Sequence, residues 1–231
     1  MEDNQIKIWK RAAAEAAVSE VGSGMLIGLG TGSTAAFAVD ALASRVRSGL
    51  DCRVVVTSLR TERHAVAAGI KVLPLDKVAR VDLAIDGVDE IDPGLRAIKG
   101  AGGAMLREKV VATAAQRMIA IADATKAVDQ LGARPVPVEA LPVALAFITA
   151  AIASMGARPL MRERAGKTVR TDQRNLIIDC HFGEISDPAG LALRLSQVPG
   201  ILGHGLFIDE IDALYVGGID GVTRVDRPAA V

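Results

Sequence analysis

The chain has 231 residues, of which half are apolar and 3% aromatic, and its 27 basic side chains balance its 27 acidic ones. A formal net charge of zero argues against a nucleic-acid partner held by phosphate neutralisation and favours a small ligand bound at a local site. The apolar half is enough for a sizeable core, and its Ala, Val, Leu and Ile residues are typical of parallel α/β sheets.

The sequence indicates neither export nor membrane insertion. The N-terminal stretch MEDNQIKIWKR lacks the apolar core of a secretory signal, and the longest near-apolar stretch, residues 143–157, is too short to span a bilayer. We expect that stretch to form a buried helix. Cys52 and Cys180 are isolated, which suits the reducing cytoplasm, and the three histidines lack the spacing of metal ligands. We therefore expect a cytoplasmic protein without a metal, a nucleic-acid partner or a membrane contact.

Helices and strands alternate through the first part of the chain, because apolar runs of strand length are followed by stretches with a helical period. The predicted elements are helix 7–20, strand 24–30, helix 33–46, strand 53–58, helix 61–69, strand 70–75, strand 81–86, helix 104–117 and strand 118–123. Ser33 or Thr34 is the natural N-cap of the second helix. This alternation implies βαβ units, so we predict an α/β fold with a mainly parallel sheet.

The pattern changes at LGARPVPVEALP, residues 131–142, where three prolines interrupt the alternation. Beyond this point we predict a strand, helix 143–155, strand 158–162, a polar turn over 164–175, strand 176–182 and helix 188–197. These elements make a compact α+β insert of the ferredoxin-like type. A last strand, 213–220, returns to the first sheet. The predicted division is one domain of residues 1–131 with 208–231, and an insert of residues 132–207.

A glycine turn, GLGTGSTA at residues 28–35, joins the first strand to the next helix. Such a junction aims free backbone N–H groups and the positive end of the helix at an anion. A dinucleotide fingerprint would need glycine in place of Ser33 and an acidic residue where the second strand ends in Thr57 and Ser58. The hydroxyls of the turn instead suit a terminal phosphate monoester; the alternative is an ordinary capped turn.

An acidic loop, IDGVDEID at residues 85–92, follows the strand over 81–86. Asp86 stands at the carboxyl end of this strand, where ligands bind in open α/β sheets. Gly87 lets the backbone come close to a ligand, and Asp89 follows it. Crowded carboxylates repel each other, which raises a pKa and lets one of them exchange protons with hydroxyls. The alternative is a solvated, charged turn.

A second glycine loop lies in IKGAGGAMLREK, residues 98–109. Lys99, beside free N–H groups, can stabilise an oxyanion, and Glu108 can take a proton from carbon. The alternative places Glu108 and Lys109 on the solvent face of a helix. Lys126, after the fifth predicted strand, is another candidate cation at the carboxyl end of the sheet.

These motifs together supply what the aldose–ketose isomerisation of a phosphorylated sugar needs. A base moves a proton between C1 and C2, hydrogen-bond donors hold the enediolate, and a neighbouring acid transfers the hydroxyl proton. No redox cofactor is expected, because the reaction redistributes hydrogen within one molecule.

At these residues the sequence resembles the type A ribose-5-phosphate isomerases. The stretches GLGTGSTA, DLAIDGVDEID, IKGAGGAMLREK, IADATK, GARPVPVE and VGGIDGV occur in family order and extend over most of the chain. The resemblance implies a Rossmann-like sheet with an inserted ferredoxin-like α+β domain. It also implies interconversion of D-ribose 5-phosphate and D-ribulose 5-phosphate, as in the non-oxidative pentose phosphate pathway, by a homodimer or homotetramer that needs no cofactor.

The resemblance implies a role for each matching residue. Glu108 would be the base, Asp86 would help ring opening and hydroxyl proton transfer, and Lys99 would stabilise the enediolate. Lys10 corresponds less closely to a phosphate-contacting lysine. The implied substrate-binding residues are Thr31, Gly32, Ser33, Thr34, Asp86, Gly87, Val88, Asp89, Lys99, Gly100, Ala101, Gly102 and Lys126.

Three residues depart from the family pattern. Ala101 stands where the family usually has glycine, and its Cβ would cost about 1 kcal/mol if that position needs a positive φ. Arg174 and His204 replace the small or amide residues that the family pattern leads us to expect, and both lie outside the proposed site.

Two other classes of function remain open from the sequence. A sugar-phosphate sensor would bind without turnover, but the chain has no DNA-binding segment and a sensor would have no use for Glu108. A CoA-transferase-like enzyme would use a glutamate nucleophile, but 231 residues in this arrangement leave little room for a long thioester pocket.

Overall fold

The computed structural model describes residues 2–228 of the chain. Its central sheet consists of β1 (Leu26–Leu29), β2 (Arg53–Val56), β3 (Leu83–Gly87), β6 (Met118–Asp123), β14 (Ala213–Gly218) and β15 (Gly221–Asp226). The strand order is β15-β14-β6-β3-β1-β2, and all neighbours are parallel except β15, which runs antiparallel to β14. The predicted α/β fold with a mainly parallel sheet is confirmed.

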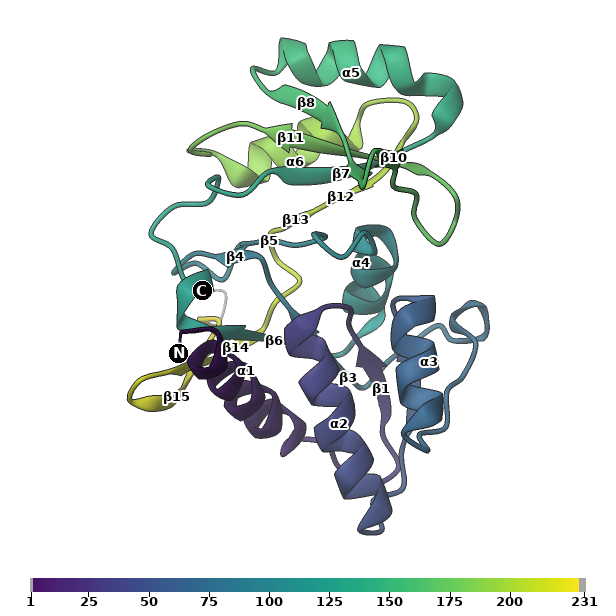
Figure 1. Ribbon diagram of the computed structural model, residues 1–231, viewed down its shortest axis with the longest axis vertical. Coiled ribbons are helices and arrows are strands. Elements are labelled where there is room, and N and C mark those ends of the chain that lie inside the picture. The colour runs from purple at the N-terminus through teal and green to yellow at the C-terminus, as the bar shows by residue number, and fades with distance from the viewer. Residues whose placement is uncertain (1, 229–231) are drawn as a thin grey trace.

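Helices cover both faces of this sheet (Figure 1). They are α1 (Glu2–Val18), α2 (Ser33–Arg47), α3 (Leu59–Ala67) and α4 (Met105–Ala114). The first three share one apolar cluster with Ile119 and Ile121 of β6, whereas α4 contributes Val111 to the cluster that contains Ala120 on the opposite face. Because successive side chains of a strand point to opposite faces, burial of both faces requires the continuous apolar runs seen in the sequence.

A second, antiparallel sheet forms the insert. Its elements are β7 (Val136–Ala140), α5 (Leu145–Ser154), β8 (Arg158–Met161), β11 (Leu176–His181), α6 (Pro188–Ser196) and β12 (Ile201–His204). The βαββαβ order and the strand order β12-β7-β11-β8 are those of a ferredoxin-like fold, as predicted. Both helices pack on one face, where Ile148 and Leu195 meet Val138 and Ile178. The other face contacts α4 of the central domain through β7 and β12.

Short elements join the two parts. A three-stranded sheet of β4 (Glu90–Ile91), β5 (Ala97–Ile98) and β13 (Leu206–Phe207) lies between the central sheet and the insert (Figure 1). A hairpin of β9 (Glu163–Arg164) and β10 (Lys167–Thr168) extends from the insert, and short 3-10 helices cover Leu75–Lys77, Ala124–Lys126 and Pro142–Ala144.

The structure corrects several predicted details. The strand predicted over 70–75 is reduced to one isolated bridge, between Val72 and Val54, and β15 was not predicted. The N-cap of α2 is Gly32, not Ser33 or Thr34, and it makes no side-chain cap hydrogen bond. The helix predicted to be buried has one exposed face, on which Phe147 is 57% exposed. Within residues 2–228, no helix has the length and apolar character needed to cross a membrane.

Candidate active site

The acidic loop and the first glycine turn pack together as one unit. Asp86, near the end of β3, is buried, and its Oδ1 accepts hydrogen bonds from the N–H groups of Thr31 at 3.0 Å and Gly87 at 2.7 Å. A Cβ added to Gly30 would lie 1.7 Å from this oxygen, so only glycine fits beside the carboxylate. The alternative of a solvated turn is therefore excluded for Asp86, whereas Asp89 is half-buried.

Lys99, which follows β5, lies at the centre of a buried charge cluster. Its Nζ is 2.8 Å from Asp86 Oδ2 and 3.4 Å from Glu108 Oε2, and it donates a hydrogen bond to the Gly87 carbonyl. Burial lowers the pKa of Lys99, but Asp86 and Glu108 raise it by more, so that the pKa lies above its usual value and the ammonium keeps its charge.

Glu108 lies in the first turn of α4 and is only 2% exposed, so the alternative of a solvent-facing glutamate is excluded. Its Oε2 accepts no hydrogen bond from any described residue. Burial raises the pKa of Glu108 to about 8; Lys99 opposes this shift, and Asp86 and Asp89 add to it.

The two buried carboxyls therefore differ. Burial also raises the pKa of Asp86, but Lys99 and the N–H groups of Gly87 and Thr31 stabilise its charged form. Glu108 has the lysine only at 3.4 Å and lacks such N–H donors. Burial raises the pKa of both carboxyls, and the Lys99 ammonium that lies beside both couples their titration.

A cationic end of the site forms around the start of α2. The Lys10 Nζ of α1 donates a hydrogen bond to Ser33 Oγ at 3.0 Å and lies 3.9 Å from the fully buried Asp123 at the end of β6. With the N–H groups at the beginning of α2, this lysine makes the region suitable for an anion. The Thr31 hydroxyl is instead engaged with the hydroxyls of Thr57, Ser58 and Thr61.

A pocket of about 230 Å³ connects the cationic end with the buried charge cluster. Every predicted substrate-binding residue lines it except Asp86, which lies behind the wall and contacts Lys99. The structure thus brings together Thr31, Gly32, Ser33, Thr34, Gly87, Val88, Asp89, Lys99, Gly100, Ala101, Gly102, Lys126, Glu108 and Lys10. Ala101 is not among the described non-glycine residues with positive φ, so the strain considered from the sequence does not arise.

Two further residues of the wall, Arg60 and Arg164, were missed in the sequence. Arg60 is in the first turn of α3, just after the N-cap Ser58, and Arg164 is in the β9–β10 hairpin of the insert. Both are exposed arginines without a motif around them, and only the packing of the insert beside the central domain brings them to one pocket.

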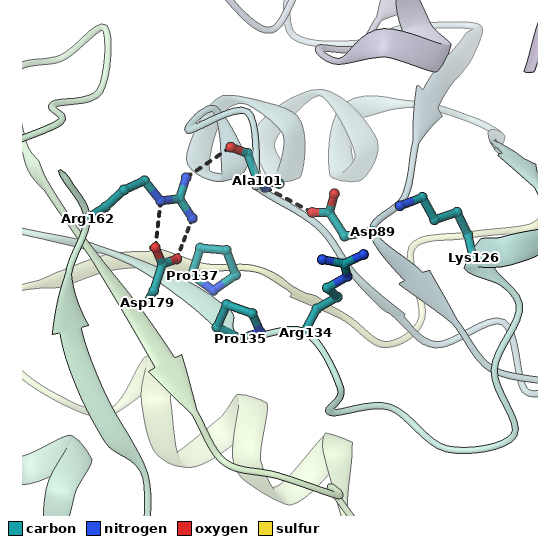
Figure 2. A pocket seen from close by; sticks show the side chains of 8 residues that line it. All are labelled: Asp89, Ala101, Lys126, Arg134, Pro135, Pro137, Arg162 and Asp179. Carbon is teal, nitrogen blue, oxygen red and sulfur yellow. Dashed lines mark hydrogen bonds and ion pairs between the residues drawn. The ribbon is translucent and has the colours of Figure 1, made fainter. Parts of the chain in front are cut away.

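A second pocket of about 330 Å³ adjoins the first, sharing Asp89, Ala101 and Lys126 with it (Figure 2). Its remaining wall comes from the insert side and includes Arg134, Arg162 and Asp179. Within residues 2–228, no group of three or more His, Cys, Asp or Glu side chains is arranged to hold a metal ion.

A buried lysine–carboxylate centre at the carboxyl ends of parallel strands, open to an anion-binding pocket, defines an α/β enzyme that carries out acid–base chemistry. Comparison with known proteins identifies the family. Residues 53–221 match the family model of ribose 5-phosphate isomerase A, also called phosphoriboisomerase A, and the chain belongs to this family.

The similarity extends over the whole fold. A ribose-5-phosphate isomerase A from Rhodopseudomonas palustris is 49% identical over 225 residues, which are 94% of this chain and 97% of that relative. The solved ribose 5-phosphate isomerase A of Methanocaldococcus jannaschii superimposes with a TM-score of 0.90 at 36% identity, covering 94% of this chain and 97% of that one. A solved D-ribose-5-phosphate isomerase in complex with phospho-erythronic acid reaches 0.93 at 36% identity, covering 96% and 99%.

Proposed function

We propose that this protein interconverts D-ribose 5-phosphate and D-ribulose 5-phosphate through an enediolate, with Glu108 as the base. The observation that carries the proposal is the buried Glu108, whose pKa of about 8 lies near neutral pH and which lines the same pocket as the cationic end. A base with a pKa close to the working pH combines a useful ionised fraction with a strong driving force for proton transfer. The family and its solved complex with a sugar-acid phosphate support the same substrate class.

The phosphate of the substrate binds at the start of α2. Gly32, Ser33 and Thr34 supply N–H and hydroxyl donors there, and Lys10 supplies a positive charge held by Ser33 and Asp123. Thr31 lines the pocket and shapes the turn, because its N–H is engaged by Asp86 and its hydroxyl by neighbouring hydroxyls. Lys126 lies where the two pockets meet and adds a second cation.

The reacting carbons bind between Glu108 and Lys99. Ionised Glu108 takes the proton from C2 of the open-chain aldose, the electron pair forms the C1–C2 double bond, and the former carbonyl oxygen O1 takes up a proton. Loss of the proton on O2 re-forms a carbonyl there, and Glu108 returns its proton to C1. Lys99 and the loop of Gly100, Ala101 and Gly102 stabilise the negative charge on the oxygens.

The acidic loop has two roles in this scheme. Asp86 orients Lys99 at 2.8 Å and exchanges the hydroxyl proton through that lysine, which also serves ring opening. Gly87, Val88 and Asp89 form the wall that contacts the sugar hydroxyls. Because all hydrogen moves within the substrate or through side chains, the reaction needs no redox cofactor.

We also propose that the chain acts in the cytoplasm as a homodimer or homotetramer and divides into residues 1–131 with 208–231, and an insert of residues 132–207. Two buried free cysteines, Cys52 and Cys180, fit a reducing compartment. The exposed apolar face of α5, with Phe147, offers surface for a second copy. Light scattering coupled to gel filtration measures the assembly; a monomer at micromolar concentration would contradict it.

Proton exchange tests the function directly. Incubation with ribose 5-phosphate in D₂O, without metal or nucleotide, is followed by NMR at the C2 proton. We expect deuterium uptake together with ribulose 5-phosphate. Binding with neither exchange nor product would favour a sensor, and deuterium-free product would exclude an enediolate that exchanges with solvent.

A further inference from the structure

Arg162, which follows β8 of the insert, reaches the loop that carries Lys99. Its Nη1 donates hydrogen bonds to the carbonyls of Gly100 at 2.9 Å and Ala101 at 3.1 Å. Its Nε and Nη2 donate to the two carboxylate oxygens of Asp179 on β11, with 2.8 Å for the Nε contact. Figure 2 shows the guanidinium between Asp179 and Ala101. Because the planar guanidinium binds a carboxylate on one side and two carbonyls on the other, its orientation is fixed as well as its position.

These contacts determine which way the loop peptides face. The C=O and N–H of a trans peptide point in opposite directions. The peptide between Gly100 and Ala101 is held at both ends, because its carbonyl faces Arg162 and its N–H donates to Asp89 Oδ2 at 2.9 Å. The Ala101 carbonyl also faces Arg162, so the N–H of Gly102 points away from the arginine.

The N–H of Gly102 is left without an acceptor among the described residues. Gly102 and Lys99 line the pocket that contains Glu108, whereas Arg162 does not line this pocket but the neighbouring one. A turn closed by the hydrogen bond from Gly103 N to Gly100 O, at 2.9 Å, keeps this arrangement compact. The Gly102 N–H therefore faces the pocket that contains Glu108. There it is a neutral hydrogen-bond donor in addition to the charged Lys99 ammonium.

We propose that Arg162 is a positioning residue that holds the Gly100 and Ala101 carbonyls away from the substrate and thereby directs the Gly102 N–H at the enediolate oxygen. This inference rests on the proposed function and adds to it a role for the insert. Without the guanidinium the Ala101 peptide can rotate, and its carbonyl would then face the negative charge that develops in the reaction. Loss of one such donor typically costs about 10²- to 10³-fold in kcat; because Arg162 acts through the backbone, we expect about a tenfold to hundredfold loss.

The test compares Arg162→Met with Arg170→Met, a control in the polar turn that follows Arg162 in the insert. Among residues 2–228 the Arg170 side chain donates a hydrogen bond only to the Arg174 carbonyl, and none to the loop of Gly100 and Ala101. We expect Arg162→Met to lower kcat by about tenfold to hundredfold with KM changed less than about threefold, and Arg170→Met to match wild type. Unchanged kcat in Arg162→Met would overturn the inference.

Binding separates positioning from a merely structural role. Phospho-erythronic acid carries a planar carboxylate like the enediolate, whereas inorganic phosphate probes only the cationic end. We expect Arg162→Met to weaken the first ligand by the same factor as kcat and to leave the second unchanged. Equal weakening of both would indicate general damage to the site and overturn the inference. If Arg162→Met does not fold, Arg162→Lys takes its place in the test. The lysine keeps the positive charge but lacks the planar guanidinium, and a kcat equal to that of wild type would refute the proposal.

Different results would overturn the proposed isomerase function and the proposed role of Arg162. Wild-type protein and Arg170→Met that do not isomerise ribose 5-phosphate would overturn the proposed function and, with it, this inference. Normal turnover in these two proteins together with normal turnover in Arg162→Met would overturn the role of Arg162 alone.

Discussion

Glu108→Gln is the sharpest test of the chemistry, because it removes the base and keeps the shape of the side chain. The glutamine cannot accept a proton from C2, and general base catalysis typically contributes about 10²- to 10⁴-fold. We therefore expect kcat to fall at least about a hundredfold while the affinity for inorganic phosphate, bound at the distant cationic end, stays within about twofold. Glu139→Gln is the matched control, because Glu139 is fully buried in the insert and does not line the pocket.

The pH dependence follows from the same carboxyl. A pKa of about 8 leaves Glu108 about one-tenth ionised at pH 7 and about one-hundredth at pH 6. In the wild type, kcat/KM should rise about tenfold per pH unit up to about pH 8 and then level off. Initial rates of ribulose 5-phosphate formation between pH 6 and 9 measure this. A profile that is flat below pH 8, or a Glu108→Gln variant within tenfold of wild type, would refute the assignment.

The shift of the Glu108 pKa has a consequence for stability whose sign is fixed. The folded-state pKa of about 8 lies above the ordinary value of 4.5, so between these values the folded protein binds more protons than the unfolded chain. The contribution of this group is complete below about pH 4.5 and is lost as the pH rises through 8. The glutamine does not titrate, so Glu108→Gln lacks this loss. The free energy of unfolding of the variant, measured relative to that of wild type, should therefore increase by on the order of 1 kcal/mol per pH unit across this window. Urea unfolding at pH 6, 7 and 8 measures the difference, and a constant difference would contradict the raised pKa.

Three further substitutions test single features. Ser33→Ala removes a hydroxyl at the cationic end and a partner of Lys10, so KM should rise about fivefold, the equivalent of one hydrogen bond, with kcat nearly unchanged; an unaltered KM in steady-state assays would count against phosphate binding there. Ala101→Gly should change kcat less than about threefold, because Ala101 has no positive φ to relieve; a large gain in rate would show that its Cβ does hinder the loop. Arg174→Gly should raise the melting temperature by up to about 3 °C, because Arg174 has a φ of 66° that costs an L-residue about 1 kcal/mol; calorimetry showing a lower melting temperature would mean that its side-chain packing matters more.

The sequence was sufficient to predict those site residues that lie at the carboxyl edge of the parallel sheet, where ligands bind in folds of this kind. Asp86 lies at the carboxyl end of β3, and Lys99 and Glu108 belong to the loop and helix that follow this strand, at the edge of the parallel sheet where ligands bind. The alternation of apolar runs and helical periods was strong enough to locate those strands within a few residues. Fold class and catalytic candidates therefore follow from local patterns together with one general rule.

Other parts of the site depend on contacts that no local pattern encodes. The strands β4, β5 and β13 have only two residues each, too few for a period of two to show, yet they set the position of the loop after β5. Arg162 and Arg164 come from the insert, more than fifty residues along the chain from Lys99, and the residues around them form no recognisable motif. Their contribution appears only once the two sheets are packed against each other.

The different hydrogen bonding of Asp86 and Glu108 is determined by the backbone around them and not by the two side chains themselves. Both are buried acids beside the same lysine, so side-chain identity alone assigns them equal roles. The glycine at position 30 has no Cβ, which lets the Asp86 carboxylate approach the turn and accept two backbone N–H groups. Glu108 emerges from a helix and receives no such donors. Because hydrogen bonds to the charged form of an acid lower its pKa, the glycine turn that helps bind the anion also stabilises the charged form of Asp86, and Glu108 has no such support from the backbone.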